Sequence, residues 1–238
     1  MNAQFESQLQ GIVTRVAPQS RREPERRIAV VRGAGGTSYD NVLALAQDTR
    51  QAPDVRLAAI WTLEHLKDTR AVPALLHALT DEHPAVRQAA AMSLGLLDDE
   101  RAVSPLIAAL QTDKDSSVRK ATAYALRWLG NASAVNPLLH VLQNRSEDAA
   151  VRGEAAESLG ELGARQALPS LIAALQDPSA EVRLWSAFAL GTLGDARALP
   201  ELERIAATDG AVVPHLAHLS SRGVVKKEAS EAIGRIRA

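Results

Sequence analysis

The sequence predicts an all-α fold, a right-handed α-solenoid (α-α superhelix) of about seven helical hairpins. One pattern of 31 to 33 residues recurs along most of the 238-residue chain, and a repeat of this length is typical of a solenoid. Composition agrees, because Ala and Leu dominate the 46% hydrophobic fraction whereas aromatic residues make up only 3%. The β-branched runs bounded by turn residues that strands require are hard to find.

The second helix of each predicted hairpin opens with a Val-Arg pair. A small residue follows four positions after the valine, and leucines follow eight and eleven positions after it. This spacing traces one stripe of an α-helix, so each second helix is expected to bury the stripe. The valines are Val55, Val86, Val118, Val151 and Val182, and the small residues are Ala59, Ala90, Thr122, Ala155 and Ser186. The leucines are Leu63, Leu94, Leu126, Leu159 and Leu190, then Leu66, Leu97, Leu129, Leu162 and Leu193.

The first helix of each hairpin is expected to begin near a proline suited to an opening turn, at Pro73, Pro105, Pro137 and Pro169. Because one hairpin cannot bury its own apolar stripe, stacking between repeats is expected to stabilise the fold. The two ends depart from the regular pattern. We therefore expect irregular capping helices in residues 1–38, regular repeats in 39–208, and a longer loop with a capping helix in 209–238.

Composition and charge exclude several classes of function. The 27 basic and 28 acidic residues give a net charge of -1, which produces no global field to attract nucleic acid or an anionic membrane. The absence of Cys excludes disulfides and thiolate chemistry and permits a reducing compartment. Residues 1–16 lack the unbroken apolar run of a signal peptide, and no stretch approaches a membrane span. We therefore expect a soluble, cytoplasmic protein.

The pattern Val-Arg-x-x-Ala-x-x-x-Leu-Gly-x-Leu-Gly-Asp is clearest in Val182–Asp195, where Ser186 replaces the alanine. It resembles HEAT-like repeats of the phycobilisome-lyase (PBS lyase) type, over roughly residues 40–238. The resemblance implies HEAT-like hairpins whose second helices line the concave side of the solenoid. The broad class includes bilin lyase subunits, an iron-dependent hydroxylase of a modified lysine, DNA glycosylases and scaffolding proteins. The fold alone therefore does not name an activity.

An arginine follows each of the five valines, at Arg56, Arg87, Arg119, Arg152 and Arg183. This column could form an anion-binding row. The simpler interpretation is a ladder of ion pairs that fixes the loops, because each arginine lies near an acidic loop. A guanidinium group can bridge a carboxylate and free carbonyl groups at the same time.

When each valine is counted as position 1, the fourth, seventh and eleventh positions of the second helices share a face about 100° from the buried stripe. Five of the seven aromatic residues occupy this face, although the repeat closes without them. They could fill gaps between repeats, but a contiguous aromatic surface is typical of a binding site. The predicted binding residues are Trp61, His65, Met92, Tyr124, Arg127, Trp128, Glu154, Glu157, Glu161, Trp185 and Phe188.

The three glutamates beside these aromatic residues favour a partner with apolar and basic groups, such as a peptide segment or helix, and disfavour nucleic acid. We therefore expect a non-catalytic scaffold that binds a protein or peptide in an aromatic, partly acidic concave groove. The alternative, taken from the resemblance, is a bilin lyase-like or tetrapyrrole-binding subunit. An enzyme of this kind would be a lyase-type subunit acting on a bilin.

We predict no catalytic residue, no metal site and no cofactor. His215 and His218 lie one helical turn apart, but no carboxylate partner is evident nearby. A basic cluster near the N-terminus could bind an acidic partner or nucleic acid, or remain a solvated end. The cluster comprises Arg21, Arg22, Arg26 and Arg27. The sequence leaves open the identity of the partner, the oligomeric state, and whether the loop of residues 209–223 occupies the groove.

Overall fold

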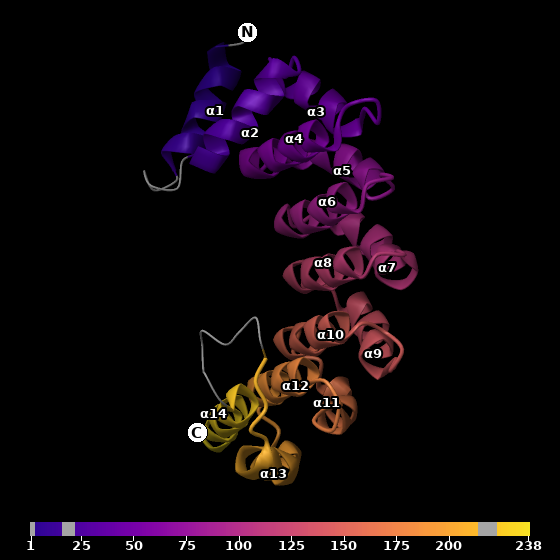
Figure 1. Cartoon of the computed structure of the whole chain (residues 1–238), viewed down its shortest axis with the longest axis vertical. Helices are drawn as coiled ribbons and strands as arrows, with labels where there is room; N and C mark the ends of the chain where they lie inside the picture. The colour runs from indigo at the N-terminus through magenta and orange to yellow at the C-terminus, as the bar shows by residue number, and fades with distance from the viewer. Residues whose placement is uncertain (1–2, 16–21, 214–222) are drawn as a thin grey trace. The chain divides into compact units, whose positions relative to one another are not determined.

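The structure, a computed structural model, describes residues 3–15, 22–213 and 223–238. Within these ranges every regular element is helical, and fourteen α-helices follow one another along the chain (Figure 1). Fourteen is the number that seven hairpins require. The prediction of an all-α fold of helical hairpins is therefore confirmed.

The helices alternate as first and second members of seven pairs. The first helices are α1 (Ala3–Thr14), α3 (Tyr39–Gln47), α5 (Val72–Ala78), α7 (Val103–Thr112), α9 (Val135–Gln143), α11 (Leu168–Ala174) and α13 (Leu199–Thr208). The second helices are α2 (Arg22–Gly33), α4 (Pro53–Leu66), α6 (Pro84–Leu96), α8 (Ser116–Trp128), α10 (Ala149–Glu161), α12 (Ala180–Leu193) and α14 (Val224–Arg237). From α5 onward a short 3-10 turn precedes each first helix, at Thr69–Ala71, Glu100–Ala102, Ala132–Ala134, Arg165–Ala167 and Ala196–Ala198. Each of these first helices has its proline in the opening turn, as the sequence predicts.

The chain forms two compact units, residues 1–109 and 110–238. In the first unit, α4 packs against α6 and is also contacted by α1 and α2, while α3 lies beside α5. In the second unit, α8, α10, α12 and α14 pack side by side in one layer, and α9 and α11 form a second layer against them (Figure 1). The expected boundaries of capping and regular segments stay a prediction.

The constant columns of the repeat form the core of each unit. All five small residues and the first leucine column, from Leu63 to Leu190, are 0% exposed. Burying each leucine contributes about 1.5–3 kcal/mol. The second leucine column is less buried than predicted, because Leu97 is 8% exposed and the other four are half-buried. These leucines lie at the C-terminal ends of their helices, where the packed stripe gives way to a loop.

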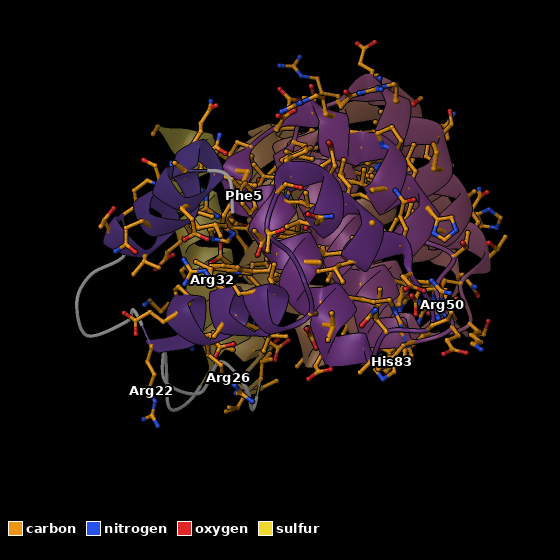
Figure 2. All side chains as sticks on the ribbon, turned by 90° about the horizontal axis from the view of Figure 1, so that it is seen from above. Phe5, Arg22, Arg26, Arg32, Arg50 and His83 are labelled. Carbon is orange, nitrogen blue, oxygen red and sulfur yellow. The ribbon has the colours of Figure 1, made fainter. Side chains whose placement is uncertain are left out.

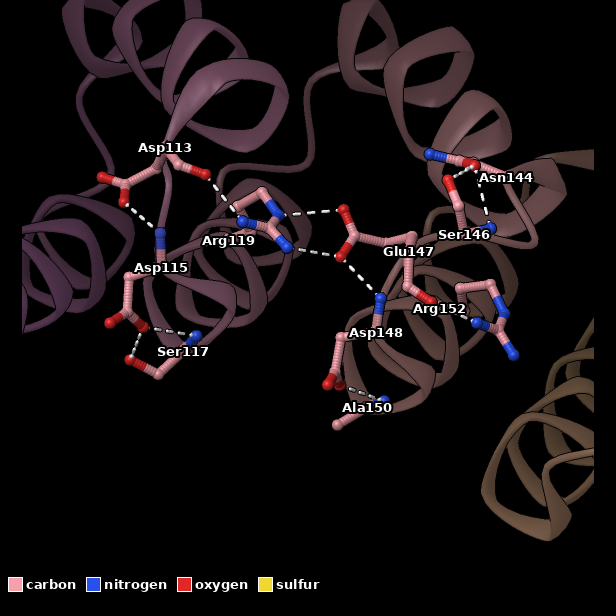
Figure 3. Close-up of polar contacts among 10 residues, drawn as sticks. All are labelled: Asp113, Asp115, Ser117, Arg119, Asn144, Ser146, Glu147, Asp148, Ala150 and Arg152. Atoms are coloured by element: carbon pink, nitrogen blue, oxygen red, sulfur yellow. Dashed lines mark hydrogen bonds and ion pairs between the residues drawn. The ribbon is translucent and has the colours of Figure 1, made fainter.

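The arginine column forms a structural ladder, as predicted, but its carboxylate partners come from the following repeat. Arg119 donates to the backbone carbonyl of Asp113 at 2.7 Å and to the carboxylate of Glu147 at 2.6 Å (Figure 3). Arg152 donates to the backbone carbonyl of Glu147 and reaches the carboxylate of Asp177 at 2.9 Å. The same arrangement links Arg56 to Asp81 and Arg183 to Asp209. These arginines therefore tie consecutive loops together within each unit.

Candidate binding site

In the first unit, the predicted face lies on α4 and α6. The rings of Trp61 and His65 stack with centroids 4.0 Å apart and planes inclined by 32°. One turn of helix separates them, and His65 Nδ1 lies 2.9 Å from the backbone carbonyl oxygen of Trp61. On α6, Met92 is 38% exposed and Leu96 is 43% exposed. This face therefore combines a half-buried aromatic pair with an exposed apolar patch.

Helices α1 and α2 contact the aromatic pair. The guanidinium carbon of Arg27 lies 5.4 Å from the centroid of the Trp61 ring, which is a cation-π distance. Arg15 Nη2 donates a hydrogen bond to the backbone carbonyl of His65 at 3.3 Å. A hollow of about 370 Å³ lies between α1, α4 and α6, and its lining includes Ile12 and Leu96. The N-terminal helices thus cover part of this face and leave the α6 side open.

The basic N-terminal cluster is divided in the structure. Arg27 pairs with Glu23 at 2.9 Å and also lies over Trp61. Figure 2 shows Arg22 extending away from α2 into solvent. Arg21 lies outside the described residues, as do the histidines at positions 215 and 218. The interpretation of this cluster as a binding site stays a prediction.

In the second unit, the face begins with an aromatic pair on α8. The ring centroids of Tyr124 and Trp128 are 6.0 Å apart, with planes inclined by 50°. Tyr124 is half-buried, whereas Trp128 is 55% exposed, the largest exposure among the large hydrophobic residues that the structure describes. The guanidinium carbon of Arg127 lies 4.8 Å from the centroid of the Tyr124 ring. Arg127 is thus held against an aromatic face by its own helix.

The three predicted glutamates on α10 converge on Arg127. Its Nη1 lies 2.7 Å from Glu157 Oε1, its Nη2 lies 3.5 Å from Glu154 Oε1, and its Nε lies 3.5 Å from Glu161 Oε2. The side chain of Arg127 is only 9% exposed. The expected acidic patch is therefore partly neutralised inside the molecule. We call Arg127, Glu154, Glu157 and Glu161 the Arg127 cluster.

Burial within the Arg127 cluster changes the acidity of Glu154. Glu154 is 8% exposed, and its Oε1 makes no hydrogen bond. Loss of hydration raises the pKa of Glu154 to about 7, and the negative charge of Glu157 adds to this effect, whereas Arg127 opposes it. Glu161, at the end of α10, has a side chain that is 44% exposed. The three glutamates on one face therefore differ in environment, and only Glu161 is open to solvent.

The last pair of predicted residues lies on α12. The rings of Trp185 and Phe188 meet edge to face, with centroids 6.0 Å apart and planes inclined by 82°. A Cβ atom at Gly153 on α10 would lie 3.0 Å from Trp185 Cδ1, so the glycine makes room for this ring. From α14, the guanidinium carbon of Arg235 lies 5.5 Å from the centroid of Phe188. Both rings are half-buried and take part in packing between helices.

The structure thus groups the eleven predicted residues into two sets, one in each unit. The first set is Trp61, His65 and Met92, and the second set is Tyr124, Arg127, Trp128, Glu154, Glu157, Glu161, Trp185 and Phe188. Sequence reasoning missed the ion pair between Lys120 Nζ and Glu181 Oε1, at 3.8 Å, which joins α8 to α12. A Cβ atom at Gly153 on α10 would lie 3.3 Å from Glu181 Cγ, so this glycine leaves room for Glu181 and is a signal visible in the sequence.

No group of three or more His, Cys, Asp or Glu side chains among the described residues is arranged to hold a metal ion. No helix within the described part of the chain is long and apolar enough to cross a membrane.

Comparisons with known proteins identify relatives of the fold. The family model described as HEAT repeats matches residues 40–127, 76–148 and 135–220. The structure of the complex of CpcE and CpcF of phycocyanin lyase from Nostoc sp. PCC7120 is similar at 27% identity, with a TM-score of 0.59, covering 72% of this chain and 71% of that chain. No curated protein matches the sequence.

Two further structures share the fold at lower identity. The YibA protein of Escherichia coli is 18% identical, with a TM-score of 0.54, covering 100% of this chain and 97% of that chain. A computationally designed armadillo repeat protein for modular peptide recognition is 19% identical, with a TM-score of 0.52, covering 87% of this chain and 98% of that chain. At these identities the likeness concerns the fold alone.

Proposed function

The chain belongs to the HEAT repeat proteins, and we propose that it is a non-catalytic scaffold that holds a protein or peptide against the aromatic, partly acidic face of its second helices. The observation that carries the proposal is the 55% exposure of Trp128. A repeat that used this ring for packing would bury it, as it buries Leu126 two positions earlier. An exposed tryptophan beside a tyrosine and an arginine has the composition of an interface centre.

The chemistry around Trp128 supports a protein or peptide as the ligand. Aromatic rings offer large contact areas while losing few rotatable bonds on binding, and tryptophan, tyrosine and arginine dominate the energetics of protein interfaces. Glu161 adds an exposed carboxylate at the end of α10, next to α8. In the first unit, Met92 and Leu96 supply a separate apolar surface. Methionine adapts its shape to a partner because its side chain is unbranched and polarisable.

The test replaces Trp128 by alanine and compares partner capture from an extract of the native cells. We expect Trp128→Ala to keep the helical circular dichroism signal and to weaken binding by at least about 2 kcal/mol, which is roughly thirtyfold. Tyr39→Ala is the matched control, because it removes an aromatic side chain that belongs to the first helix α3 and not to the predicted face. Unfolding of Trp128→Ala, or unchanged capture by it, would contradict the proposal.

A bilin lyase-like or tetrapyrrole-binding subunit is the second candidate function. The 27% identity to the CpcE and CpcF complex of phycocyanin lyase over most of both chains favours it. The exposed Trp128 ring and its neighbour Tyr124 could then stack on a conjugated ligand. Addition of bilins to the purified protein should shift their visible absorption, and Trp128→Ala should reduce the shift. An unchanged spectrum with excess protein would exclude this function.

A further inference from the structure

The Arg127 cluster already shows which chemical group this surface holds. One face of the Arg127 guanidinium lies over the Tyr124 ring at 4.8 Å, and its nitrogens lie 2.7 to 3.5 Å from three carboxylates. An aromatic face combined with carboxylates is the usual environment for a guanidinium or ammonium group. The cluster is thus arranged for a cation of this class.

The charges in and around the cluster do not balance. Glu154, Glu157, Glu161 and Glu181 carry four negative charges when ionised, against two positive charges on Arg127 and Lys120, so the formal sum is -2. These side chains come from α8, α10 and α12, which pack together within the second unit. The excess negative charge would attract a further cation.

Glu154 provides an independent sign that the cluster is electrostatically incomplete. Its side chain is 9% exposed, and its Oε1, which lies 3.5 Å from Arg127 Nη2, makes no hydrogen bond. Buried carboxylates are ordinarily paired and hydrogen-bonded, because an ion that has lost its water is costly. Additional positive charge near the cluster would reduce this cost.

We propose that the open end of the cluster, between Trp128 and Glu161, binds an arginine or lysine side chain of the partner, beside Arg127. This inference rests on the proposed scaffold function and specifies the partner as a basic segment. Trp128 is the last residue of α8, and Glu161 is the last residue of α10. Arg127 connects them, because it is adjacent to Trp128 in sequence and its Nε lies 3.5 Å from Glu161 Oε2. The exposed ring of Trp128 would contact the aliphatic stem of the partner side chain, and the exposed carboxylate of Glu161 would contact its charged end.

Binding of this kind should release a proton. Glu154 has a pKa of about 7, so a large fraction of it is protonated near neutral pH. The groups that face it are Glu157 and Glu161 on its own helix and Arg127 and Lys120 on α8, while Glu181 on α12 holds Lys120. His140, the titratable residue of α9, is exposed and does not act on Glu154. An incoming cation favours the ionised carboxylate, so binding should strengthen as the pH rises through 7.

The experiment uses fluorescein-labelled peptides rich in Leu, Ala and Gln, each made with one central arginine or with neutral citrulline in its place. Fluorescence anisotropy with the full chain measures their affinities. We expect the arginine form to bind about fivefold to tenfold more tightly than its citrulline twin. Glu161→Gln should remove this preference, because it neutralises an exposed carboxylate without affecting the core. Glu100→Gln, an exposed change in the first unit, is the control and should preserve it.

The pH dependence gives a second readout. Between about pH 6 and pH 8, affinity for the arginine peptide should rise by up to tenfold, the change that corresponds to lowering the pKa of Glu154 by one unit. Glu154→Gln should abolish this rise. Equal binding of arginine and citrulline peptides, or an unchanged preference in Glu161→Gln, would overturn the inference and leave the scaffold function standing. If no peptide of either form binds, the scaffold function fails as well.

Discussion

Replacement of Glu154 by glutamine should stabilise the protein, and by an amount that depends on pH. The change keeps the size of the side chain and removes a buried negative charge. In the folded protein the pKa of Glu154 rises from 4.5 to about 7, mainly through burial. A raised carboxyl pKa means that the folded state prefers the protonated form. In the wild-type protein, protonated Glu154 therefore contributes its full stabilisation of the folded state below about pH 4.5, and this stabilisation is lost as the pH rises through about 7.

The size of the effect follows from the shift. Each pKa unit corresponds to about 1.4 kcal/mol, so the rise in the pKa of Glu154 from 4.5 to about 7 sets an upper limit of roughly 3.5 kcal/mol at pH 8. We expect about 2–3 kcal/mol of stabilisation by Glu154→Gln at pH 8, falling towards zero near pH 4.5. Attraction between Arg127 and Glu154 is already contained in the shift, because it opposes the effect of burial.

Urea unfolding of the full chain at a series of pH values measures this prediction. Tryptophan fluorescence is a suitable probe, because Trp128 and Trp185 both belong to the unit that contains Glu154. Glu161→Gln is the matched control, and its effect should stay within about 0.5 kcal/mol because its side chain is 44% exposed. Destabilisation by Glu154→Gln at pH 8, or a gain that does not shrink as the pH falls, would refute the reasoning.

Three further predictions concern the scaffold and its face. Arg152→Ala should cost about 3–5 kcal/mol in urea unfolding, because it leaves the carboxylate of Asp177 buried without its partner at 2.9 Å. Arg197→Ala breaks an ion pair of similar length whose arginine is 72% exposed, and it should cost much less than Arg152→Ala. Gly160→Ala should lower the free energy of unfolding by about 1–3 kcal/mol and so lower the melting temperature, because its Cβ would lie 2.5 Å from a Cα atom of α12. Trp128→Ala should change the unfolding free energy by less than about 1 kcal/mol, in contrast to its effect on binding.

Each of these predictions has an outcome that would contradict it. Equal losses from Arg152→Ala and Arg197→Ala would mean that burial does not set the strength of the arginine ladder. A fully stable Gly160→Ala protein would show that α10 and α12 can separate without cost. A large loss of stability in Trp128→Ala would assign that ring to the core.

Much of the fold could be predicted because the repeat is a local property of the sequence. The spacing of valine, small residue and leucine follows the helical period, so it identifies which side of each second helix is buried. The small column and the first leucine column are indeed fully buried. The resemblance to HEAT-like repeats was likewise visible in Val182–Asp195 and is confirmed by the match to HEAT repeats.

The environment of the candidate site could not be read in the same way. Glu154, Glu157 and Glu161 share one helix face, and sequence alone treats them as equivalent carboxylates. In the structure Glu154 is buried and its pKa is raised, whereas the side chain of Glu161 remains exposed. The difference arises from burial, because α8 and α12 both pack against α10, while Arg127 on α8 opposes the rise in the pKa of Glu154.

The sequence by itself determined the helices, their pairing and the apolar stripes, because these depend on residues within one or two turns of each other. Tertiary structure alone decided which carboxylate each arginine meets, since Arg152 and Asp177 lie 25 residues apart. It also decided which aromatic rings remain open to solvent: Trp128 is exposed, whereas Trp185 and Phe188 pack between helices. Burial, ionisation and exposure depend on neighbours contributed by other repeats, and the period of one helix carries no information about them.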